Sequence, residues 1–501
     1  PREHTAMPEL EPLDCTEWVW RNKYALTPTE TRIEQTWQRV AAAAASAEGD
    51  RAHWTQAFFR QLRRFAFLPG GRILAGAGTD NSGTLCSCFV MAPFADSFRG
   101  LQRGIEQASR TMRAGGGTGF DFSSLRPAGD PGYDDNTLAP GPVAVARILD
   151  ALCGATITRS GRRGAMMATL RCDHPDIEQF IQAKHAPGEL THANLSVLIT
   201  DAFMRAVDDD AQWPLVFPKD PSQQPAAQTI YRTLNARELW QQLKRAAFDG
   251  GEPGVLFIDR INALNNLSGR ETLISTNPCA EQPLPAYGAC TLGSVNLPRF
   301  VRQPFTAQAQ MDHAALRACV SDGVRLLDNI VDIARYPLAL QAQTARQTRR
   351  IGLGFTGLAD ALAMLNLNYT GTPAQHAAQQ IMASISDAAY QASAHLAAEK
   401  GPYPSWDWQA FAASHRASLL SAGTLGLVRR WGLRNSHLTA IAPAGTISLL
   451  AGNVSSGIEP IFGPVVERNA HTRSGGVCRL VTQDYACFLW HRFAPGQPLP
   501  E

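Results

Sequence analysis

Two cysteines and a glutamate share one proline-rich stretch, TNPCAEQPLPAYGAC, at residues 276–290. The residue before a proline is pushed out of the helical region, so Asn277-Pro278 predicts a turn or extended chain that presents Cys279 on a loop. In extended chain Glu281 points to the same side as Cys279. A neighbouring carboxylate raises the pKa of a thiol, which favours a thiol that reacts without ionising, beside a general base. A buried loop cysteine with a surface glutamate is the simpler alternative.

Three other stretches contain residue types that bind phosphates or nucleobases. They are GGGTGFDFSSLRP (115–127), RSGRRGAMMATL (159–170) and APAGTISLLAG (442–452). Glycines let backbone N–H groups approach a ligand, arginine forks suit phosphates and base edges, and the N–H groups at a helix start bind phosphate. A tight turn, a solvated basic loop and an ordinary capped helix are the respective alternatives.

A second pair of cysteines, Cys86 and Cys88, lies in the predicted strand LCSCFVM at residues 85–91. Period two places both side chains on one face, where an inert buried thiol is the usual case. The sequence has no C-x-x-C, and this pair has no close Cys/His partners, so we expect no structural zinc. In a reducing compartment the ten cysteines are expected to be redox or catalytic thiols rather than a disulfide framework.

The composition excludes several classes of protein. With 501 residues, 45% of them hydrophobic and 18% charged, the chain can build a large core. A formal net charge of +2 gives no indication of direct nucleic-acid binding. No apolar run reaches the length of a membrane span, and the first residues do not resemble a signal peptide, so we expect a cytoplasmic protein.

The elements that would position these residues alternate between strand and helix. Helices are predicted within residues 29–67, before the Pro-Gly-Gly at 69–71. Beyond residue 83, glycine turns separate short apolar runs from amphipathic segments, which favours a parallel α/β sheet or barrel. The strand candidates are 85–91, 118–122, 165–170, 194–200 and 254–258, and the helix candidates are 98–112, 142–156, 175–185, 236–248, 312–335, 355–365 and 373–399.

In their order along the chain, these motifs resemble the catalytic subunit of ribonucleotide reductases. The resemblance spans roughly residues 20–490 and is greatest to class II, the adenosylcobalamin-dependent branch, whose loop reads NPC-x-EQPL. It is carried by CSCFV, GGGTGFDFSSLRP, SGRRGAMMATL, HPDIEQFIQAK, NLSVLITDAFM, TNPCAEQPLPAYGACTLGSVNL, RRIGLGFTGLADAL and APAGTISLLAGNVSSGIEP.

The resemblance implies a ten-stranded α/β barrel made of two antiparallel five-stranded halves. A finger loop, at about residues 274–292, would pass through its centre. We therefore expect an N-terminal helical region at 1–75 and the catalytic barrel at 76–501. The sequence ends earlier than the last barrel strands would, so the barrel is expected to be incomplete or completed by another segment.

The resemblance also implies a role for five side chains. Cys279 would be the thiyl-radical cysteine that takes the 3′ hydrogen of a ribonucleotide, which requires no ionised thiol. Glu281 would be the general base on the 3′-OH, and Asn277 would hold the ribose hydroxyls. Cys88 and Cys290 would be the reducing pair. One would protonate the departing 2′-OH, and both would end as a disulfide, which requires Cα atoms within about 7 Å.

Substrate and effector contacts are implied by the same comparison. The substrate-binding candidates are Ser87, Gly116, Gly117, Ala444, Gly445, Thr446 and Ile447. The family usually has threonine where this chain has Ala444, which removes one hydroxyl contact but leaves the backbone amides. Asp96 resembles a ligand of the effector ribose, and Arg162 and Arg163 match the loop that passes information from the effector to the substrate base.

The expected activity is the reduction of ribonucleotides to 2′-deoxyribonucleotides for DNA synthesis and repair, with adenosylcobalamin as cofactor. The expected partners are a diphosphate or triphosphate substrate, a dNTP specificity effector, a thioredoxin- or glutaredoxin-type reductant and a second copy in a homodimer. A class I catalytic subunit is one alternative, but the sequence has no adjacent tyrosine pair. A lapsed nucleotide-binding regulator and a thiol-dependent hydrolase with a histidine near Cys279 are the others.

Overall fold

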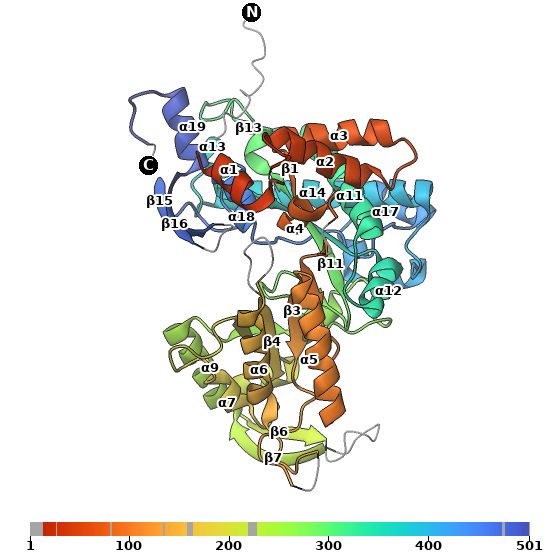
Figure 1. The fold of residues 1–501 in the computed structure, drawn as a ribbon, viewed down its shortest axis with the longest axis vertical. Helices are drawn as coiled ribbons and strands as arrows, with labels where there is room; N and C mark the ends of the chain where they lie inside the picture. The colour runs from red at the N-terminus through yellow and green to blue at the C-terminus, as the bar shows by residue number, and fades with distance from the viewer. Residues whose placement is uncertain are drawn as a thin grey trace, which may run out of the picture.

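A computed structural model describes residues 14–499 except 27, 81–82, 134–135, 158–163, 219–227 and 473–475. Figure 1 shows two parts, which meet near strands β3 (Gly117–Asp121) and β11 (Ala289–Asn296). The upper part contains the N-terminal helices in red and the C-terminal segments in blue, so the first and last described helices, α1 (Asp14–Val19) and α19 (Tyr485–Phe493), lie on the same side of the molecule. In the described residues no helix is long and apolar enough to cross a membrane.

The N-terminal region is helical, and the helices predicted within residues 29–67 are confirmed. Its elements are α1 (Asp14–Val19), the π-helical turn η1 (Trp20–Tyr24), α2 (Ile33–Ala45), α3 (Arg51–Arg63) and α4 (Gly71–Gly76). Asp50 caps α3, because its carboxylate accepts a hydrogen bond from the His53 amide at 3.0 Å. Trp37 of α2 and Phe58 of α3 are fully buried, so the two helices share one apolar interface.

Five parallel strands form the first half of the main sheet. In spatial order they are β2 (Cys88–Val90), β3, β4 (Met166–Arg171), β5 (Ala193–Ile199) and β8 (Gly254–Phe257). The connecting helices are α5 (Phe98–Arg113), α6 (Gly141–Ala155), α7 (Ile177–Ile181), α8 (Asp201–Asp208) and α9 (Ala236–Gly250). Met166, Ala168 and Leu170 of β4 pack with these helices, so the alternate residues of the strand face the opposite side.

The second half runs in the opposite direction but contains fewer strands. β11 is antiparallel to β2 and to β1 (Phe67–Pro69), and parallel to β14 (Ile351–Thr356). One further parallel bridge joins Leu353 to Thr439. The next strands, β15 (Val465–His471) and β16 (Val477–Gln483), pair only with each other among the described residues. Two antiparallel halves are therefore confirmed, but the ten-strand barrel is incomplete.

The remaining elements surround this sheet. The strands are β6 (Gln212–Pro218), β7 (Gln228–Asn235), β9 (Ser275–Thr276), β10 (Pro283–Leu284), β12 (Val301–Arg302) and β13 (Gln310–Met311). The helices are α10 (Ile258–Ala263), the 3-10 turn η2 (Leu297–Phe300), α11 (His313–Ile333), α12 (Ala339–Thr348), α13 (Leu358–Met364), α14 (Thr372–Lys400), α15 (Trp408–Ala412), α16 (His415–Ser418), α17 (Ala422–Trp431), α18 (Gly445–Leu450) and α19 (Tyr485–Phe493).

The predicted finger is the hairpin formed by β9 and β10, which lies against β2, β3 and β4. A Cβ added at Gly119 of β3 would lie 1.8 Å from the carbonyl oxygen of Thr276, so only glycine lets the finger come this close. The hydroxyl of Thr169, on the inner face of β4, donates to the Ser275 hydroxyl at 3.1 Å or accepts from it. The inner face of the parallel half therefore holds the finger.

One local prediction was wrong. Strand β2 begins only at Cys88, so Cys86 does not share its face. Cys86 packs in the core under the N-terminal helices, whereas Cys88 clusters with Cys290 and Leu292. The helix predicted at 355–365 is confirmed as α13 (Leu358–Met364), although its first two residues belong to the end of buried strand β14, which pairs with β11.

Candidate active site

Asn277 closes the fingertip loop. Its side-chain oxygen accepts a hydrogen bond from the Gln282 amide at 2.9 Å, and its carbonyl accepts one from the Ala280 amide at 3.0 Å. Ala280 adopts the left-handed conformation, with φ of 67°, which is uncommon for a residue with a side chain. The result is a tight turn that presents Cys279 at the surface of the tip.

Glu281 and Asn277 both contact the thiol of Cys88 on strand β2. The Cys88 thiol donates to Glu281 Oε1 at 3.6 Å, and Asn277 Nδ2 donates to Cys88 Sγ at 3.2 Å. The second oxygen, Glu281 Oε2, is buried and has no hydrogen-bond partner. A buried acceptor without a donor costs free energy, so this oxygen is suited to accept a hydrogen bond from a ligand hydroxyl.

Cys88 and Cys290 face each other directly across strands β2 and β11. Residues opposite each other in an antiparallel pair have Cα atoms about 4.5 to 5.5 Å apart, which lies within the range of disulfides. Both thiols are free, and both are almost completely buried. The pair can therefore form a disulfide without backbone movement.

All three thiols are held in the protonated form. Burial raises the pKa of Cys88 and Cys290 well above the usual range of a thiol, and the Glu281 carboxylate raises that of Cys88 further. Cys279 has an exposed surface, yet the crowded fingertip and Glu281 raise its pKa to about 11. These thiols can lose hydrogen atoms or donate protons, but they are poor nucleophiles at neutral pH.

The two glycines predicted to bind phosphate, Gly116 and Gly117, lie at the start of β3 in a closely packed region. The amides of Gly116 and Gly117 donate to the carbonyls of Thr111 and Ser87, at 3.0 and 2.9 Å. A Cβ at Gly117 would lie 3.0 Å from the Pro278 ring. These amide protons are therefore already used, and the Ser87 carbonyl holds the start of β3 beside the fingertip.

The second phosphate candidate lies at the start of helix α18. Ala444 precedes the helix and its amide donates to the Ser456 carbonyl at 3.1 Å. The amides of Gly445, Thr446 and Ile447 lie in the first turn, where helical amides have no partner within the helix. The Thr446 hydroxyl is 2.7 Å from the Tyr24 hydroxyl, which links this turn to the N-terminal region.

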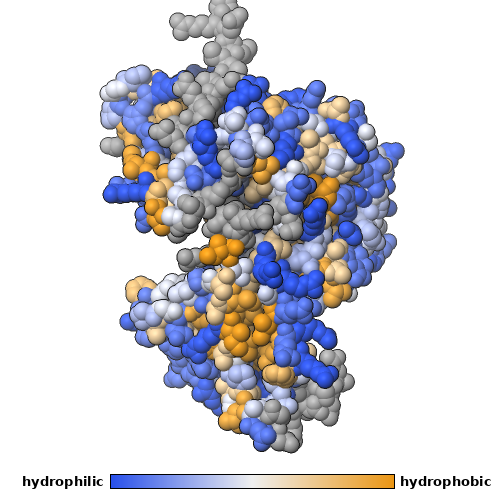
Figure 2. Space-filling view, viewed as in Figure 1, coloured by the Kyte–Doolittle hydropathy of each residue, from blue (hydrophilic) through white to orange (hydrophobic). Residues whose placement is uncertain are grey.

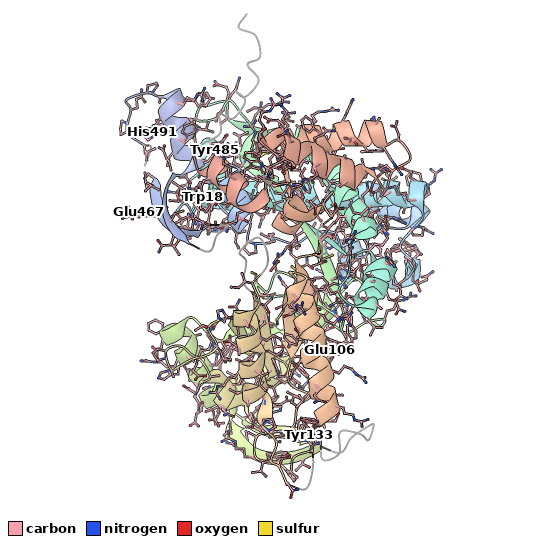
Figure 3. All side chains as sticks on the ribbon, viewed as in Figure 1. Trp18, Glu106, Tyr133, Glu467, Tyr485 and His491 are labelled. Atoms are coloured by element: carbon pink, nitrogen blue, oxygen red, sulfur yellow. The ribbon has the colours of Figure 1, made fainter. Side chains whose placement is uncertain are left out.

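The effector candidate Asp96 is engaged in contacts within the chain. Its carboxylate accepts from Arg126 Nε at 2.9 Å and from the Tyr133 hydroxyl at 2.8 Å, and Arg126 lies 4.6 Å from the centre of the Tyr133 ring. Figure 3 shows Tyr133 near the lower end of the molecule. Arg162 and Arg163 lie outside the described residues.

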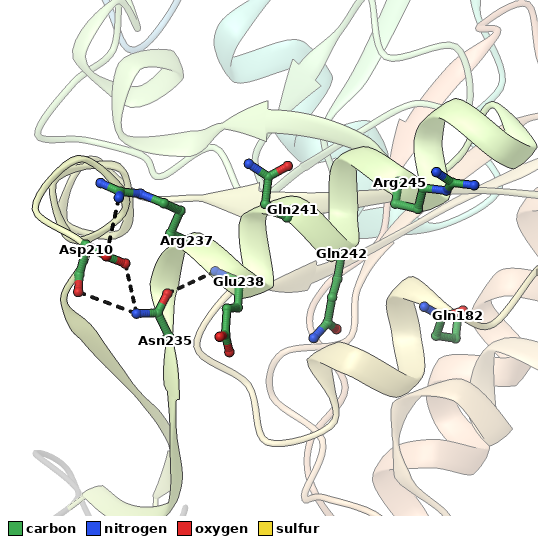
Figure 4. A pocket seen from close by; sticks show the side chains of 8 residues that line it. All are labelled: Gln182, Asp210, Asn235, Arg237, Glu238, Gln241, Gln242 and Arg245. Atoms are coloured by element: carbon green, nitrogen blue, oxygen red, sulfur yellow. Dashed lines mark hydrogen bonds and ion pairs between the residues drawn. The ribbon is translucent and has the colours of Figure 1, made fainter.

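A hollow of about 730 Å³ lies along helix α9, and none of the predicted site residues lines it. Figure 4 shows polar side chains around it, with Asn235 bonded to Asp210 and to the Glu238 amide at the start of the helix. It contains neither a thiol nor a predicted site residue. The lining residues are Gln182, Asp210, Asn235, Arg237, Glu238, Gln241, Gln242 and Arg245. We assign no chemistry to this polar surface hollow.

One buried residue near the site was not predicted from the sequence. Arg350 immediately precedes strand β14, and its charge acts on Cys290. Its Nε donates to His437 Nδ1 at 3.2 Å, and its Nη2 forms an ion pair with Glu271. The available signal was an arginine at the edge of the short apolar run IGLGFT.

Comparison with known sequences agrees with this geometry. Residues 86–484 match the profile described as "Ribonucleotide reductase, barrel domain", and residues 16–82 match "Ribonucleotide reductase, all-alpha domain". The chain therefore belongs to the ribonucleotide reductase family. The predicted division at residues 75 and 76 stays a prediction.

Curated relatives carry two kinds of name. A "Vitamin B12-dependent ribonucleoside-diphosphate reductase" of Mycobacterium tuberculosis (strain CDC 1551 / Oshkosh) is 39% identical over 89% of this chain and 61% of its own length. A protein of the same name from Thermoplasma acidophilum is 33% identical over 89% of this chain and 54% of its own. A "Ribonucleoside-diphosphate reductase subunit alpha" of Chlamydia muridarum is 27% identical over 85% of this chain and 45% of its own. The chain thus spans 61% of the length of the Mycobacterium relative and 54% of the length of the Thermoplasma relative.

Proposed function

We propose that this chain reduces ribonucleotides to 2′-deoxyribonucleotides by a thiyl-radical mechanism that depends on adenosylcobalamin. The observation that carries the proposal is the meeting of Cys279, Glu281, Asn277, Cys88 and Cys290 around one fingertip. The names of the relatives at 39% and 33% identity support B12 dependence and a diphosphate substrate. The subunit-alpha relative is only 27% identical, which makes a class I partner-dependent enzyme the weaker candidate.

The exposed thiol of Cys279 fits the cofactor, because a hydrogen atom must leave this sulfur from the outer side of the tip. Adenosylcobalamin supplies, when bound, a radical that accepts that hydrogen atom. Cys279 then takes the 3′ hydrogen of the ribose. Its pKa of about 11 keeps the sulfur protonated beforehand, so the hydrogen atom is present to be lost.

Glu281 and the cysteine pair complete the reaction in this proposal. Glu281 Oε2, the unpaired oxygen, accepts the proton of the 3′-OH. Asn277 holds the ribose hydroxyls, and one of the paired thiols protonates the departing 2′-OH. The ribonucleotide and two thiols become a deoxyribonucleotide, a disulfide between Cys88 and Cys290, and water, so atoms and electrons balance.

The proposal extends to partners. A dithiol protein of the thioredoxin or glutaredoxin type would reduce the disulfide, and the ten free cysteines suit the reducing cytoplasm. A second copy would pack on the apolar area that Figure 2 shows in orange on the lower part of the molecule. Two exposed apolar side chains suited to such a contact are Phe98 at the start of α5 and Ile148 in α6. A dNTP effector would bind near Asp96 in that dimer, and substrate phosphates near the amides of Gly445, Thr446 and Ile447.

Two alternatives are disfavoured by the same site. A thiol-dependent hydrolase needs a thiolate, whereas burial and Glu281 keep Cys279 protonated. A regulator that has lost catalysis would not need Glu281 Oε2, a buried carboxylate oxygen without a hydrogen-bond partner beside the cysteines.

The test is an assay with adenosylcobalamin and dithiothreitol, in which each ribonucleoside diphosphate and triphosphate is supplied separately. We expect deoxyribonucleoside diphosphates that depend on the cofactor, and none from Cys279→Ser. Product without adenosylcobalamin, or undiminished product from that variant, would contradict the proposal.

A further inference from the structure

Arg350 lies beside Cys290 on the inner side of the sheet. Thr291 pairs with Ile351 in the parallel ladder of β11 and β14, so Cys290 and Arg350 occupy the preceding positions of the same register. Paired positions on neighbouring strands share a face. A Cβ at Gly352, two residues after Arg350, would lie 2.5 Å from Gln282 Nε2 of the finger. This face of β14 therefore points toward the fingertip.

The guanidinium group of Arg350 is fixed but incompletely paired. Its Nε donates to His437 Nδ1 and its Nη2 bonds Glu271, while Nη1 is buried with no hydrogen-bond partner. His437 Nε2 is 3.0 Å from Asn265 Oδ1. Burial and the charge of Arg350 hold the pKa of His437 well below its usual range, so the ring is neutral and accepts through Nδ1.

An unpaired donor on a buried cation costs free energy, so it is expected to have an acceptor in some state of the working protein. Of the two paired thiols, Cys290 is the one that occupies the register position beside Arg350. Its partner Cys88 has the Glu281 carboxylate 3.6 Å from its sulfur. Burial raises the pKa of both thiols, and Glu281, which contacts Cys88, raises both further; only for Cys290 does the charge of Arg350 oppose this rise.

We propose that Arg350 is a positioning residue that makes Cys290 the leaving group when the Cys88–Cys290 disulfide is reduced. An incoming thiolate attacks Cys88 Sγ, the S–S bond breaks, and Cys290 departs as a thiolate beside the guanidinium. A second thiolate then attacks the reductant's own sulfur in the mixed disulfide, Cys88 departs, and both cysteines take up protons. The lower the pKa of the departing thiol, the faster it leaves, which is why charge decides the direction. The inference rests on the proposed function, since that reaction forms the disulfide.

The experiment identifies which sulfur is attacked. The chain is oxidised with diamide and treated with 2-mercaptoethanol, a monothiol that leaves a mixed disulfide. Free thiols are then blocked with iodoacetamide and located by peptide mass spectrometry. We expect the mercaptoethanol adduct on Cys88 and the alkyl group on Cys290, in a ratio of about ten or more, equivalent to 1.4 kcal/mol.

Three variants separate charge from packing. Arg350→Gln should reduce the ratio toward one and slow the reduction of the disulfide at neutral pH. Arg350→Lys retains the charge, so this variant should keep the preference for the Cys88 adduct. The control Arg346→Gln, at an exposed position four residues earlier, should leave the ratio unchanged.

Several outcomes would overturn the inference: an adduct mainly on Cys290 in the unmodified chain, an unchanged ratio in Arg350→Gln, or no disulfide after diamide. The first needs no variant, so a folding defect cannot hide it. The trapping uses neither nucleotide nor cobalamin. A chain that keeps the preference but makes no deoxyribonucleotide would refute the proposed function alone.

Discussion

Cys88 of strand β2 and Cys290 of strand β11 lie directly opposite each other, at the junction where the two oppositely directed halves of the sheet meet. They are 202 residues apart in sequence (290 − 88). The fold thus places a pre-formed redox pair beneath a fingertip that presents a third thiol.

Mild oxidation should join these two cysteines before any others. Diamide treatment is expected to remove two thiols and to yield one Cys88–Cys290 peptide, because no backbone movement is needed. Non-reducing peptide mass spectrometry measures the linkage. Cys290→Ser should lose it, and Cys153→Ser, a buried thiol outside the site, should retain it. Dominant linkage of Cys279 to either partner would contradict the arrangement.

Replacing Glu281 by glutamine should lower kcat by about 10²-fold or more, since a general base typically contributes that much. The same change removes a charge that raises the pKa of Cys88, so Cys88 should be alkylated faster at alkaline pH. Turnover and a pH profile of iodoacetamide labelling measure the two effects. Glu467→Gln, on the exposed hairpin β15–β16, is the control and should change neither. Equal turnover in both variants would remove Glu281 from the mechanism.

Gly119→Ala tests the seating of the finger on strand β3. The new methyl group would lie 1.8 Å from the Thr276 carbonyl oxygen, so finger or strand must shift. Overpacking of this kind costs about 1 to 3 kcal/mol, and activity should fall with the displaced tip. Chemical denaturation and turnover give the two values. Gly426→Ala, in α17 with no atom within 4 Å of the added Cβ, should instead be neutral or stabilising. A fully active, equally stable Gly119→Ala would disprove the close approach.

Stability should depend on pH through Asp360, which is buried and accepts from the amides of Ser455 and Ala486. Burial, followed by the charge of Asp484, raises its pKa to about 7. The folded state therefore binds this proton more tightly than the unfolded state, so the contribution is complete below about pH 4 and is lost as the pH rises toward 7.

The corresponding measurement compares Asp360→Asn with the unmodified chain by urea denaturation. Asparagine mimics the protonated acid, so the stability advantage of the unmodified chain should shrink between pH 4 and 7 by at least about 1.4 kcal/mol, the value of one pKa unit. A difference independent of pH would show that Asp360 keeps its ordinary pKa in the folded state.

Local chemistry made part of this site predictable. The prolines around Cys279 predicted a loop, and the carboxylate beside a thiol predicted an unionised sulfur, in agreement with the raised pKa. The pairing of Cys88 with Cys290 could not follow from spacing, because only the sheet brings them together, and it was expected from family resemblance alone. Arg350 was missed because no local pattern predicts that the residues after it form strand β14; that strand forms by pairing with β11.

The glycines show the same limit. A tight turn was one interpretation of GGGTGF, and the resemblance added phosphate binding by Gly116 and Gly117, which stays a prediction. The packing role of Gly117 and Gly119, which make room for the Pro278 ring and the Thr276 carbonyl, was not foreseen. Nothing in the sequence identifies the segment that will lie against a glycine. Among the described residues, the first half of the sheet has all five expected strands, whereas the oppositely directed second half has fewer.

The most direct test of the central claim follows the hydrogen that Cys279 is proposed to remove. A ribonucleoside diphosphate with deuterium at C3′ is supplied with adenosylcobalamin and dithiothreitol, and product formation is compared with that from unlabelled substrate. We predict slower formation of the deoxyribonucleotide from the labelled substrate, and no product with either substrate from Cys279→Ser. Equal rates for the two substrates together with full activity of that variant would contradict radical chemistry at the fingertip.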